Sequence, residues 1–228
     1  MRGLCSSLCA LTLLLPAFAL GQDTYKIEPL KQGPPEGFTA AIKAELSAEG
    51  YRILTGDGKP FAEIWLRKAI PASGKPSGPQ ATIQFPILAE GELLGGLRFA
   101  SEGHDYRDQS ISPGIYTLRY GLQPVNGDHL GVSPFRDYAL LVPAAKDKSV
   151  AIIPRDTLEE ESAESAGTSH PAVLMLFSVD ESADSTQLTH NEEKKTWGAN
   201  LPLALAVKGE KSTAALKTQL IIVGGVME

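Results

Sequence analysis

Alternation of apolar and polar residues, broken by short turns, dominates this chain beyond its first 21 residues and constrains it to β structure. The clearest unit joins residues 51–55 to residues 61–67 through Gly56-Asp57-Gly58-Lys59. An Asp-Gly pair suits this turn because the turn needs positive φ angles. The sequence therefore predicts a β-hairpin here. The same pattern predicts strands over residues 81–85, 93–99, 114–122, 135–142, 172–179, 197–207 and 216–223. Residues 38–46 suit a strand or a short helix, and we expect a strand because the neighbouring segments are strands.

The run of residues 114–122 shows the alternation most fully and predicts a strand with one buried face. Arg119 lies in the opposite phase to the apolar residues of this run. We therefore expect Arg119 to face solvent or to pair across the sheet with Asp108 or Asp137. Such a pair would orient loops rather than perform chemistry.

An acidic stretch interrupts the β pattern between residues 155 and 168. Asp156-x-x-Glu159 resembles a capping box, so we expect one short, solvated acidic helix over residues 157–166. The number of strands and the short turns predict a mainly β fold, namely an antiparallel β-sandwich or jelly roll. We expect a single domain over residues 22–228 with this helix as an insertion; a linker between two lobes is the alternative.

The N-terminus has the three parts of a signal peptide. Arg2 supplies the positive start, residues 8–15 are apolar, and Ala19-Leu20-Gly21 provides a cleavage site, with Ala17-Phe18-Ala19 as the alternative. We therefore expect residues 1–21 to be removed and the mature protein to be periplasmic or secreted. Both cysteines lie in this segment, so the mature chain would have no disulfide and no thiolate metal site.

The charge balance is acidic, with 21 Lys and Arg residues against 27 Asp and Glu residues. Nucleic acids and anionic membranes attract basic surfaces, so neither is an expected partner. After the signal segment, no run of residues is long and apolar enough to cross a membrane. The partners that remain are a small molecule, a glycan or an envelope protein.

Sequence motifs for catalysis are absent from the chain. It contains no G-x-S-x-G nucleophile motif, and residues 91–96 lack both the phosphate-loop lysine and the dinucleotide spacing. The sequence does not identify a cofactor. A non-catalytic protein is therefore favoured over an enzyme.

The densest polar segment runs from residue 101 to residue 137 and supports two interpretations. The first is a ligand site, and the second is a divalent-metal site built from imidazole and carboxylate groups. On a simple hairpin path the histidines lie at opposite ends of a strand, which weakens the metal site. The ligand candidates are Arg119, Asp128, His129, Arg136 and Asp137, and the metal candidates are His104, Asp105, Asp108, Asp128 and His129.

The aromatic residues could form a platform for a sugar or a peptide. Tyr116, Tyr120 and Tyr138, however, alternate in phase with aliphatic neighbours, so we expect them in the core. Trp197, which precedes a glycine, is more open to a binding role.

Two segments carry a family resemblance. Pro113-Gly-Ile-Tyr-Thr-Leu-Arg-Tyr-Gly121 and Gly127-Asp-His-Leu-Gly-Val-Ser-Pro-Phe-Arg-Asp137 look like exported proteins of environmental bacteria. The Pro-Gly-x-Tyr-x-Leu piece is similar to the β-sandwich family DUF2911. The resemblance covers about a sixth of the chain. It implies a β-sandwich and export, and no activity.

These observations favour an exported, non-catalytic binding or accessory domain of the bacterial envelope. The alternative is a metal-binding protein or metal-dependent enzyme that uses the His and Asp residues of the segment 104–137. A third possibility is a structural component of the envelope, which would present an apolar patch or an open edge strand.

Overall fold

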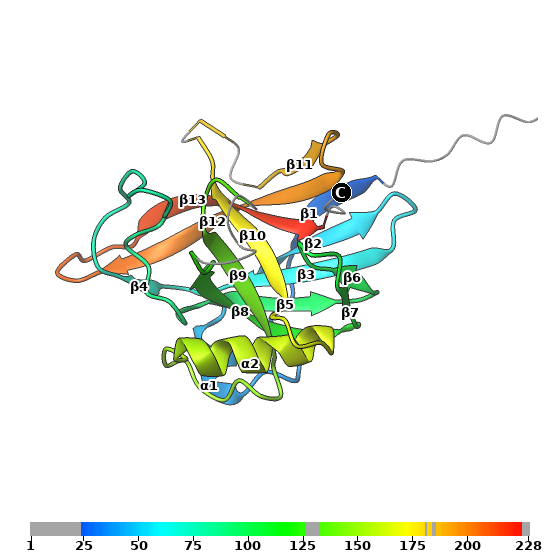
Figure 1. Ribbon diagram of the computed structural model, residues 1–228, viewed down its shortest axis with the longest axis horizontal. Coiled ribbons are helices and arrows are strands. Elements are labelled where there is room, and N and C mark those ends of the chain that lie inside the picture. Colours follow the sequence, from blue (N-terminus) through cyan, green and yellow to red (C-terminus); the bar gives the residue numbers. More distant parts are fainter. Residues whose placement is uncertain (1–23, 126–132, 181, 184–185, 225–228) are drawn as a thin grey trace, which may run out of the picture.

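The computed structural model describes residues 24–125, 133–180, 182–183 and 186–224. The expected signal peptide and the candidates Asp128 and His129 lie outside these residues. The fold is mainly β, as predicted (Figure 1). Its strands are β1 (Tyr25–Leu30), β2 (Gly50–Thr55), β3 (Pro60–Leu66), β4 (Ile70–Ala72), β5 (Leu93–Phe99), β6 (Gly103–His104), β7 (Ser110–Ile111), β8 (Gly114–Leu122), β9 (Asp137–Pro143), β10 (Val173–Ser178), β11 (Leu188–Asn191), β12 (Thr196–Val207) and β13 (Ala214–Val223).

Eleven strands belong to one sheet in the order β1-β2-β3-β5-β8-β9-β10-β13-β12-β11, with β4 beside β12. The pairings are antiparallel except for the parallel pair β4 and β12. The predicted hairpin is confirmed, because β2 pairs with β3 through the Asp57 turn. The small pair β6 and β7 stands apart from this sheet.

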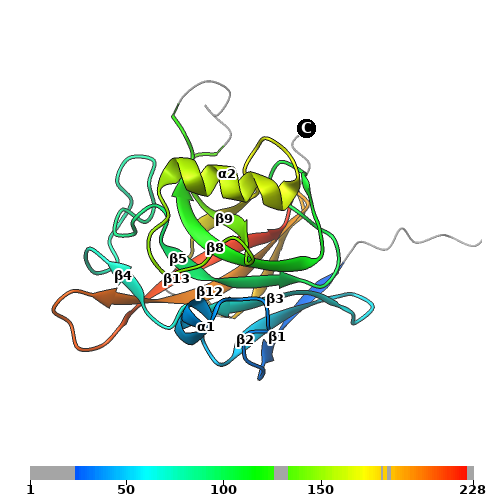
Figure 2. The same cartoon turned by 90° about the horizontal axis from the view of Figure 1, so that it is seen from below.

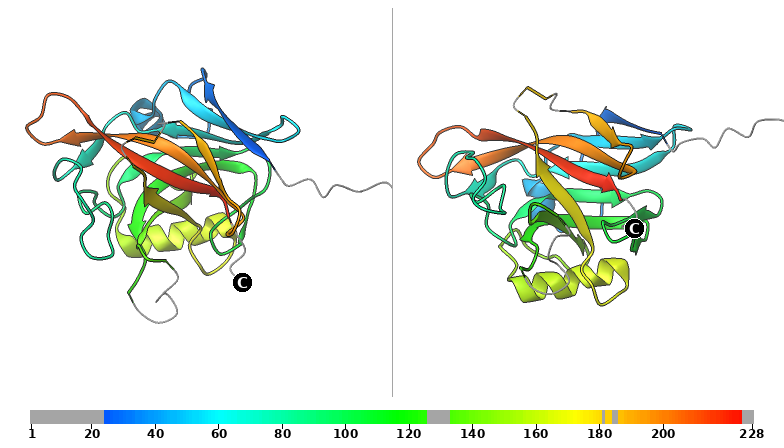
Figure 3. Two further views of the ribbon diagram at one scale, coloured as in Figure 1. Left: turned by 90° about the horizontal axis from the view of Figure 1, so that it is seen from above. Right: turned by 45° about the horizontal axis from the view of Figure 1, so that its top comes forward.

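The large sheet curls so strongly that its first and last strands approach one another (Figure 3). The rings of Tyr25 on β1 and Trp197 on β12 meet edge to face, with centroids 5.6 Å apart. Alternate residues of the strands fill the enclosed space, among them Ile64, Leu97 and Leu203. This interior accounts for the period-2 pattern of the sequence.

The helix α1 (Ala40–Glu45) covers the outer face of β3 and β5, where a strand over residues 38–46 was predicted (Figure 2). That prediction is wrong for a local reason. The Thr39 hydroxyl accepts a hydrogen bond from the Ile42 amide and starts a helical turn, and the Ala-rich segment favours a helix. Ile42 then packs with Phe38 and Leu46 against the sheet.

The helix α2 (Arg155–Ala166) lies across the outer face of the sheet and packs mainly against β9 (Figure 2). The acidic helix is thus confirmed, whereas its capping box is wrong. Pro154 occupies the N-cap position without a side-chain hydrogen bond, and Glu159 instead accepts a hydrogen bond from Arg155 at 2.9 Å. Leu158 is buried beneath the helix.

The predicted strand over residues 81–85 is a turn, closed by reciprocal backbone hydrogen bonds between Gln80 and Ile83. The next two amides, of Gln84 and Phe85, donate to the carboxylate of Asp137 at 2.8 and 3.0 Å. A side chain therefore takes the place of a neighbouring strand. Phe85 enters the core inside the curled sheet.

Candidate functional site

A row of alternating charges crosses four strands on the outer face of the sheet. The register places Glu28 opposite Arg52, Arg52 opposite Glu63, and Glu63 opposite Arg98. Directly opposed residues lie about 4.5–5.5 Å apart between Cβ atoms, close enough for each charge to meet its neighbour. The fold thus brings together residues from β1, β2, β3 and β5.

Glu63 is the centre of this row, and its side chain is only 5% exposed. Its Oε1 accepts from Nε of Arg52 at 2.9 Å and from Nη2 of the same guanidinium at 2.8 Å. Its Oε2 accepts from Nη1 of Arg98 at 3.0 Å. Both oxygens are therefore engaged, and this buried carboxylate holds two guanidinium groups in place.

The row borders a groove of about 630 Å³ between the β2–β3 turn and the end of β5. The turn supplies a second ion pair, because Lys59 contacts Asp57 at 2.6 Å. The hydrogen bond from Lys59 lowers the pKa of Asp57 to about 2, and the same contact raises the pKa of Lys59. The groove is lined by Arg52, Thr55, Asp57, Lys59, Pro60, Glu63, Arg98, Ala100 and Ser101.

The arrangement suits binding better than proton transfer. Both carboxylate oxygens of Glu63 already accept hydrogen bonds from guanidinium groups. The side chain of Arg98 is 47% exposed and, within the described residues, donates a single hydrogen bond, the one to Glu63. A guanidinium has five N–H donors, so Arg98 retains donors that a ligand in the groove can use.

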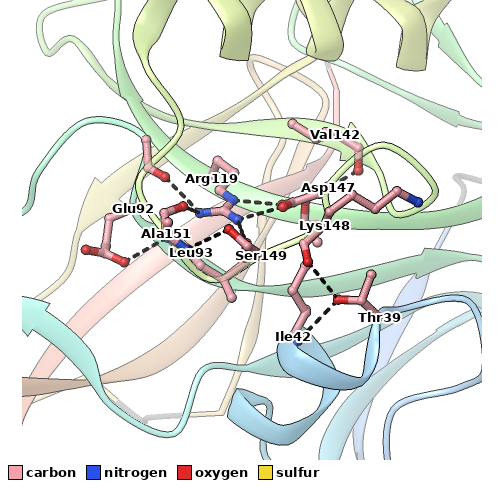
Figure 4. A network of polar contacts seen from close by, with 12 residues as sticks. Thr39, Ile42, Glu92, Leu93, Arg119, Val142, Asp147, Lys148, Ser149 and Ala151 are labelled. Atoms are coloured by element: carbon pink, nitrogen blue, oxygen red, sulfur yellow. Dashed lines mark hydrogen bonds and ion pairs between the residues drawn. The ribbon is translucent and has the colours of Figure 1, made fainter.

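Arg119, a predicted ligand residue, is fully buried in a separate network (Figure 4). Its Nε and Nη2 each donate to the Asp147 carboxylate at 2.8 Å. The remaining donors reach the carbonyls of Gly91, Ala151 and Ser149 at 3.0, 2.8 and 2.5 Å. The expectation that Arg119 faces solvent or pairs with Asp108 or Asp137 is wrong, since the strand β8 is buried on both faces.

The Arg119 network attaches the segment after β9 to the sheet. Thr117, which neighbours Arg119 on the same face of β8, donates from its hydroxyl to Asp147 at 2.6 Å. Figure 4 also shows Thr39, the N-cap residue of α1, beside the carbonyl of Lys148. Because all five donors of Arg119 are used, the network acts as a structural clamp.

Asp137 is a buried hydrogen-bond acceptor, and Arg136 is half-buried and bonded to the backbone. Asp137 is fully buried and accepts, in addition to the two amides described above, the Tyr120 hydroxyl at 2.6 Å. Burial and the contact with Asp137 raise the pKa of Tyr120. Nε of Arg136 donates to the carbonyl of Gln123 at 2.6 Å.

Of the metal candidates, the structure describes His104, Asp105 and Asp108. Asp105 is fully buried and accepts hydrogen bonds from Arg107, Gln109 and the Val173 amide, so it organises the β6–β7 hairpin. His104 lies 3.1 Å from Asp108 through its Nδ1. Within the described residues, no group of three or more His, Cys, Asp or Glu side chains could hold a metal ion. Since Asp128 and His129 lie outside those residues, the complete metal site stays a prediction.

The structure places the three tyrosines that the sequence assigned to the core, and also Trp197. Tyr116, Tyr120 and Tyr138 are buried, which confirms their core positions. Trp197 is half-buried at the end of the curled sheet, where the His190 ring stacks on it with a centroid distance of 4.3 Å.

The charged groove was not found from the sequence, although the hairpin that carries half of it was. Arg52 and Glu63 face each other because the pairing of β2 with β3 shifts by one residue between Ile53 and Leu54. Without this shift, the pairing that starts with Leu54 opposite Pro60 would place residue 62, and not Glu63, opposite Arg52. A single-residue shift reverses the face of every side chain beyond it, and nothing in the sequence marked this bulge.

Within the described residues, no helix has the length and apolar character needed to cross a membrane. The chain matches no family model, no curated protein and no solved structure.

Proposed function

We propose that this chain is an exported, non-catalytic binding protein of the bacterial envelope, and that its ligand occupies the charged groove. The observation that carries the proposal is the buried carboxylate of Glu63, which holds two guanidinium groups at the side of an open groove. Such donors are set before a ligand arrives, which reduces the entropy lost on binding.

The surroundings of Glu63 also favour binding over catalysis. A general acid or base must exchange a proton with the substrate, yet both oxygens of Glu63 already accept from arginines. Arg52 and Arg98 belong to the lining of the groove, and their side chains are 28% and 47% exposed. The two arginines would therefore orient a ligand and supply positive charge to it.

Export, the resemblance to DUF2911 and the β-sandwich architecture belong to the same proposal. Export is supported by the three-part pattern of residues 1–21. The sandwich architecture is supported by the curl of the sheet, which lets strands from its two halves pack across a common core. The resemblance is supported by the segment that begins at Pro113.

Thermal unfolding of the mature chain in the presence of single probes tests the proposal. The probes are glucose, N-acetylglucosamine, glucuronate, glutamate, lysine and inorganic phosphate. Ser101→Trp places a bulky ring at the exposed border of the groove, whereas Arg107→Gln changes an exposed arginine outside it. We expect at least one probe to raise the melting temperature of the wild type and of Arg107→Gln, and not of Ser101→Trp. Equal responses of all three proteins to every probe would contradict the proposal.

A further inference from the structure

We propose that the charged groove recognises an oxyanion on its ligand (a carboxylate, sulfate or phosphate group), with Arg98 and Arg52 as the residues that contact it. This inference rests on the proposed function, because it assigns a chemical class to the ligand of the same groove.

The groove is locally cationic in an acidic chain. Its lining includes three basic residues, Arg52, Lys59 and Arg98, against the two acids Asp57 and Glu63. The whole chain, in contrast, has a formal net charge of −6. Asp57 balances Lys59 in an exposed pair, and Glu28, which lies outside the lining, forms an ion pair with Arg52 at 3.8 Å. Within the lining, the excess of one positive charge therefore rests on Arg98, which shares Glu63 with Arg52. A local positive charge favours an anionic ligand.

The two guanidinium groups are held in different ways. Arg52 uses Nε and Nη2 for Glu63, and its Nη1 lies 3.8 Å from Glu28, beyond hydrogen-bond distance. Arg98 uses only Nη1 for Glu63. A planar guanidinium can bind the two oxygens of a carboxylate, sulfate or phosphate with two parallel hydrogen bonds. Arg98 therefore provides the primary contact and Arg52 a second charge beside it.

The shared partner Glu63 contributes by fixing the positions of these groups. An exposed arginine loses side-chain entropy when it closes on a ligand, and this loss weakens many surface contacts. Here Glu63, at 5% exposure, already restrains both arginines. Replacement of Glu63 by Gln would leave the positive charge and weaken the restraint, so this residue is a positioning residue.

Nuclear magnetic resonance on the mature chain labelled with ¹⁵N-arginine tests the inference. Glucuronate, sulfate and inorganic phosphate are titrated separately, with glucose as the uncharged counterpart of glucuronate. We expect at least one anion to shift the side-chain signals of Arg98 and Arg52 while that of Arg107, on the exposed β6–β7 connection, stays in place. The anion that produces the strongest shift identifies the source of the oxyanion.

Variants make the test specific. Arg98→Gln should weaken binding of the responding anion about tenfold or more, the range expected for a lost hydrogen bond to a charged group. Arg98→Lys keeps the charge but lacks the planar fork, and should fall between the wild type and Arg98→Gln. Arg107→Gln should bind like the wild type. Unchanged amide spectra outside the groove would show that the variants are folded.

The outcomes separate the two proposals. Equal shifts from glucose and glucuronate, or anion binding that Arg98→Gln does not weaken, would overturn the oxyanion inference and leave the groove as a binding site. A thermal effect that depends on Ser101 and is produced only by glucose or N-acetylglucosamine, which carry no oxyanion, would have the same consequence. If, in contrast, neither the signals of the two arginines nor the thermal measurements respond to any probe, both proposals fail.

Discussion

Replacement of Asp147 by Ala should destabilise the protein strongly, because it leaves the Arg119 guanidinium buried without its counter-ion. Both side chains are almost completely buried, at 0% and 1% exposure. Removal of one partner from a buried ion pair costs about 3–5 kcal/mol, since the other charge stays in a medium that solvates it poorly. The carbonyls of Gly91, Ser149 and Ala151 would still accept from Arg119, which places the expected loss in this range rather than above it.

Urea unfolding followed by circular dichroism measures this loss. With a slope of about 2 kcal/mol per molar urea, a loss of 3–5 kcal/mol lowers the unfolding midpoint by about 1.5–2.5 M. Asp147→Asn keeps one acceptor oxygen and the size of the side chain, so its free energy of unfolding should fall by only about 1–3 kcal/mol. It serves as the informative variant if Asp147→Ala does not fold.

The matched control is the preceding residue. Lys146 pairs with Glu164 at 3.1 Å, and both side chains are about half exposed. Lys146→Ala should therefore cost less than about 1 kcal/mol. If Asp147→Ala and Lys146→Ala lowered stability by similar small amounts, the description of the Arg119 network as a structural clamp would be refuted.

Two further predictions concern the fold, and a third concerns the signal peptide expected from the sequence. Asp137→Ala should expose the amides of Gln84 and Phe85 to faster hydrogen exchange and cost at least about 2 kcal/mol, because buried donors lose their acceptor; unchanged exchange would contradict the closing role of Asp137. Burial raises the pKa of Tyr138 to about 12, so its contribution to stability is complete below pH 10 and is lost as the pH rises through 12. The free energy of unfolding, measured by urea titration, should therefore fall by about 2 kcal/mol less in Tyr138→Phe than in the wild type between pH 9 and pH 12. Equal falls in the two proteins would refute the raised pKa of Tyr138. Mass spectrometry of the protein exported by a bacterial host should give a mature chain that begins at Gln22, and an intact N-terminus would contradict the signal peptide.

The strands of this fold were predictable where the apolar alternation is local and complete. The hairpin around Asp57 and the long strands β8, β12 and β13 appear where the pattern placed them. Their inward-facing residues fill one core, so the period of the sequence and the period of the strand agree. The approach of the two ends of the sheet includes contacts such as that between Tyr25 and Trp197, which are distant in sequence and carry no local signal.

The errors arose where a side chain replaced a backbone partner or capped a turn. Residues 81–85 are apolar enough for a strand, but Asp137 takes the hydrogen bonds that a neighbouring strand would take. Residues 38–46 fit a strand or a helix equally well, and the Thr39 cap with the buried Ile42 decides for the helix. The contacts of Asp137 with the amides of Gln84 and Phe85 span 53 and 52 residues, which a window along the chain does not cover, whereas the Thr39 cap is local.

The candidate site was less predictable than the fold. Arg119 stood out because it interrupts an apolar run, and the structure explains it by a counter-ion 28 residues away, Asp147. The groove residues Arg52 and Arg98 have no such signal. Their meeting at Glu63 requires the β2–β3 bulge and the pairing of β3 with β5.

The most direct test of the central claim is a crystal structure of the mature chain, grown without sulfate or phosphate and soaked with the anion that gives the strongest shift in the nuclear magnetic resonance titration. The proposed function and its oxyanion chemistry predict density for this anion in the groove, with its oxygens against Arg98 and beside Arg52, and no such density in crystals of Arg98→Gln. Density elsewhere, or an unchanged groove at concentrations that saturate the titration, would contradict the claim.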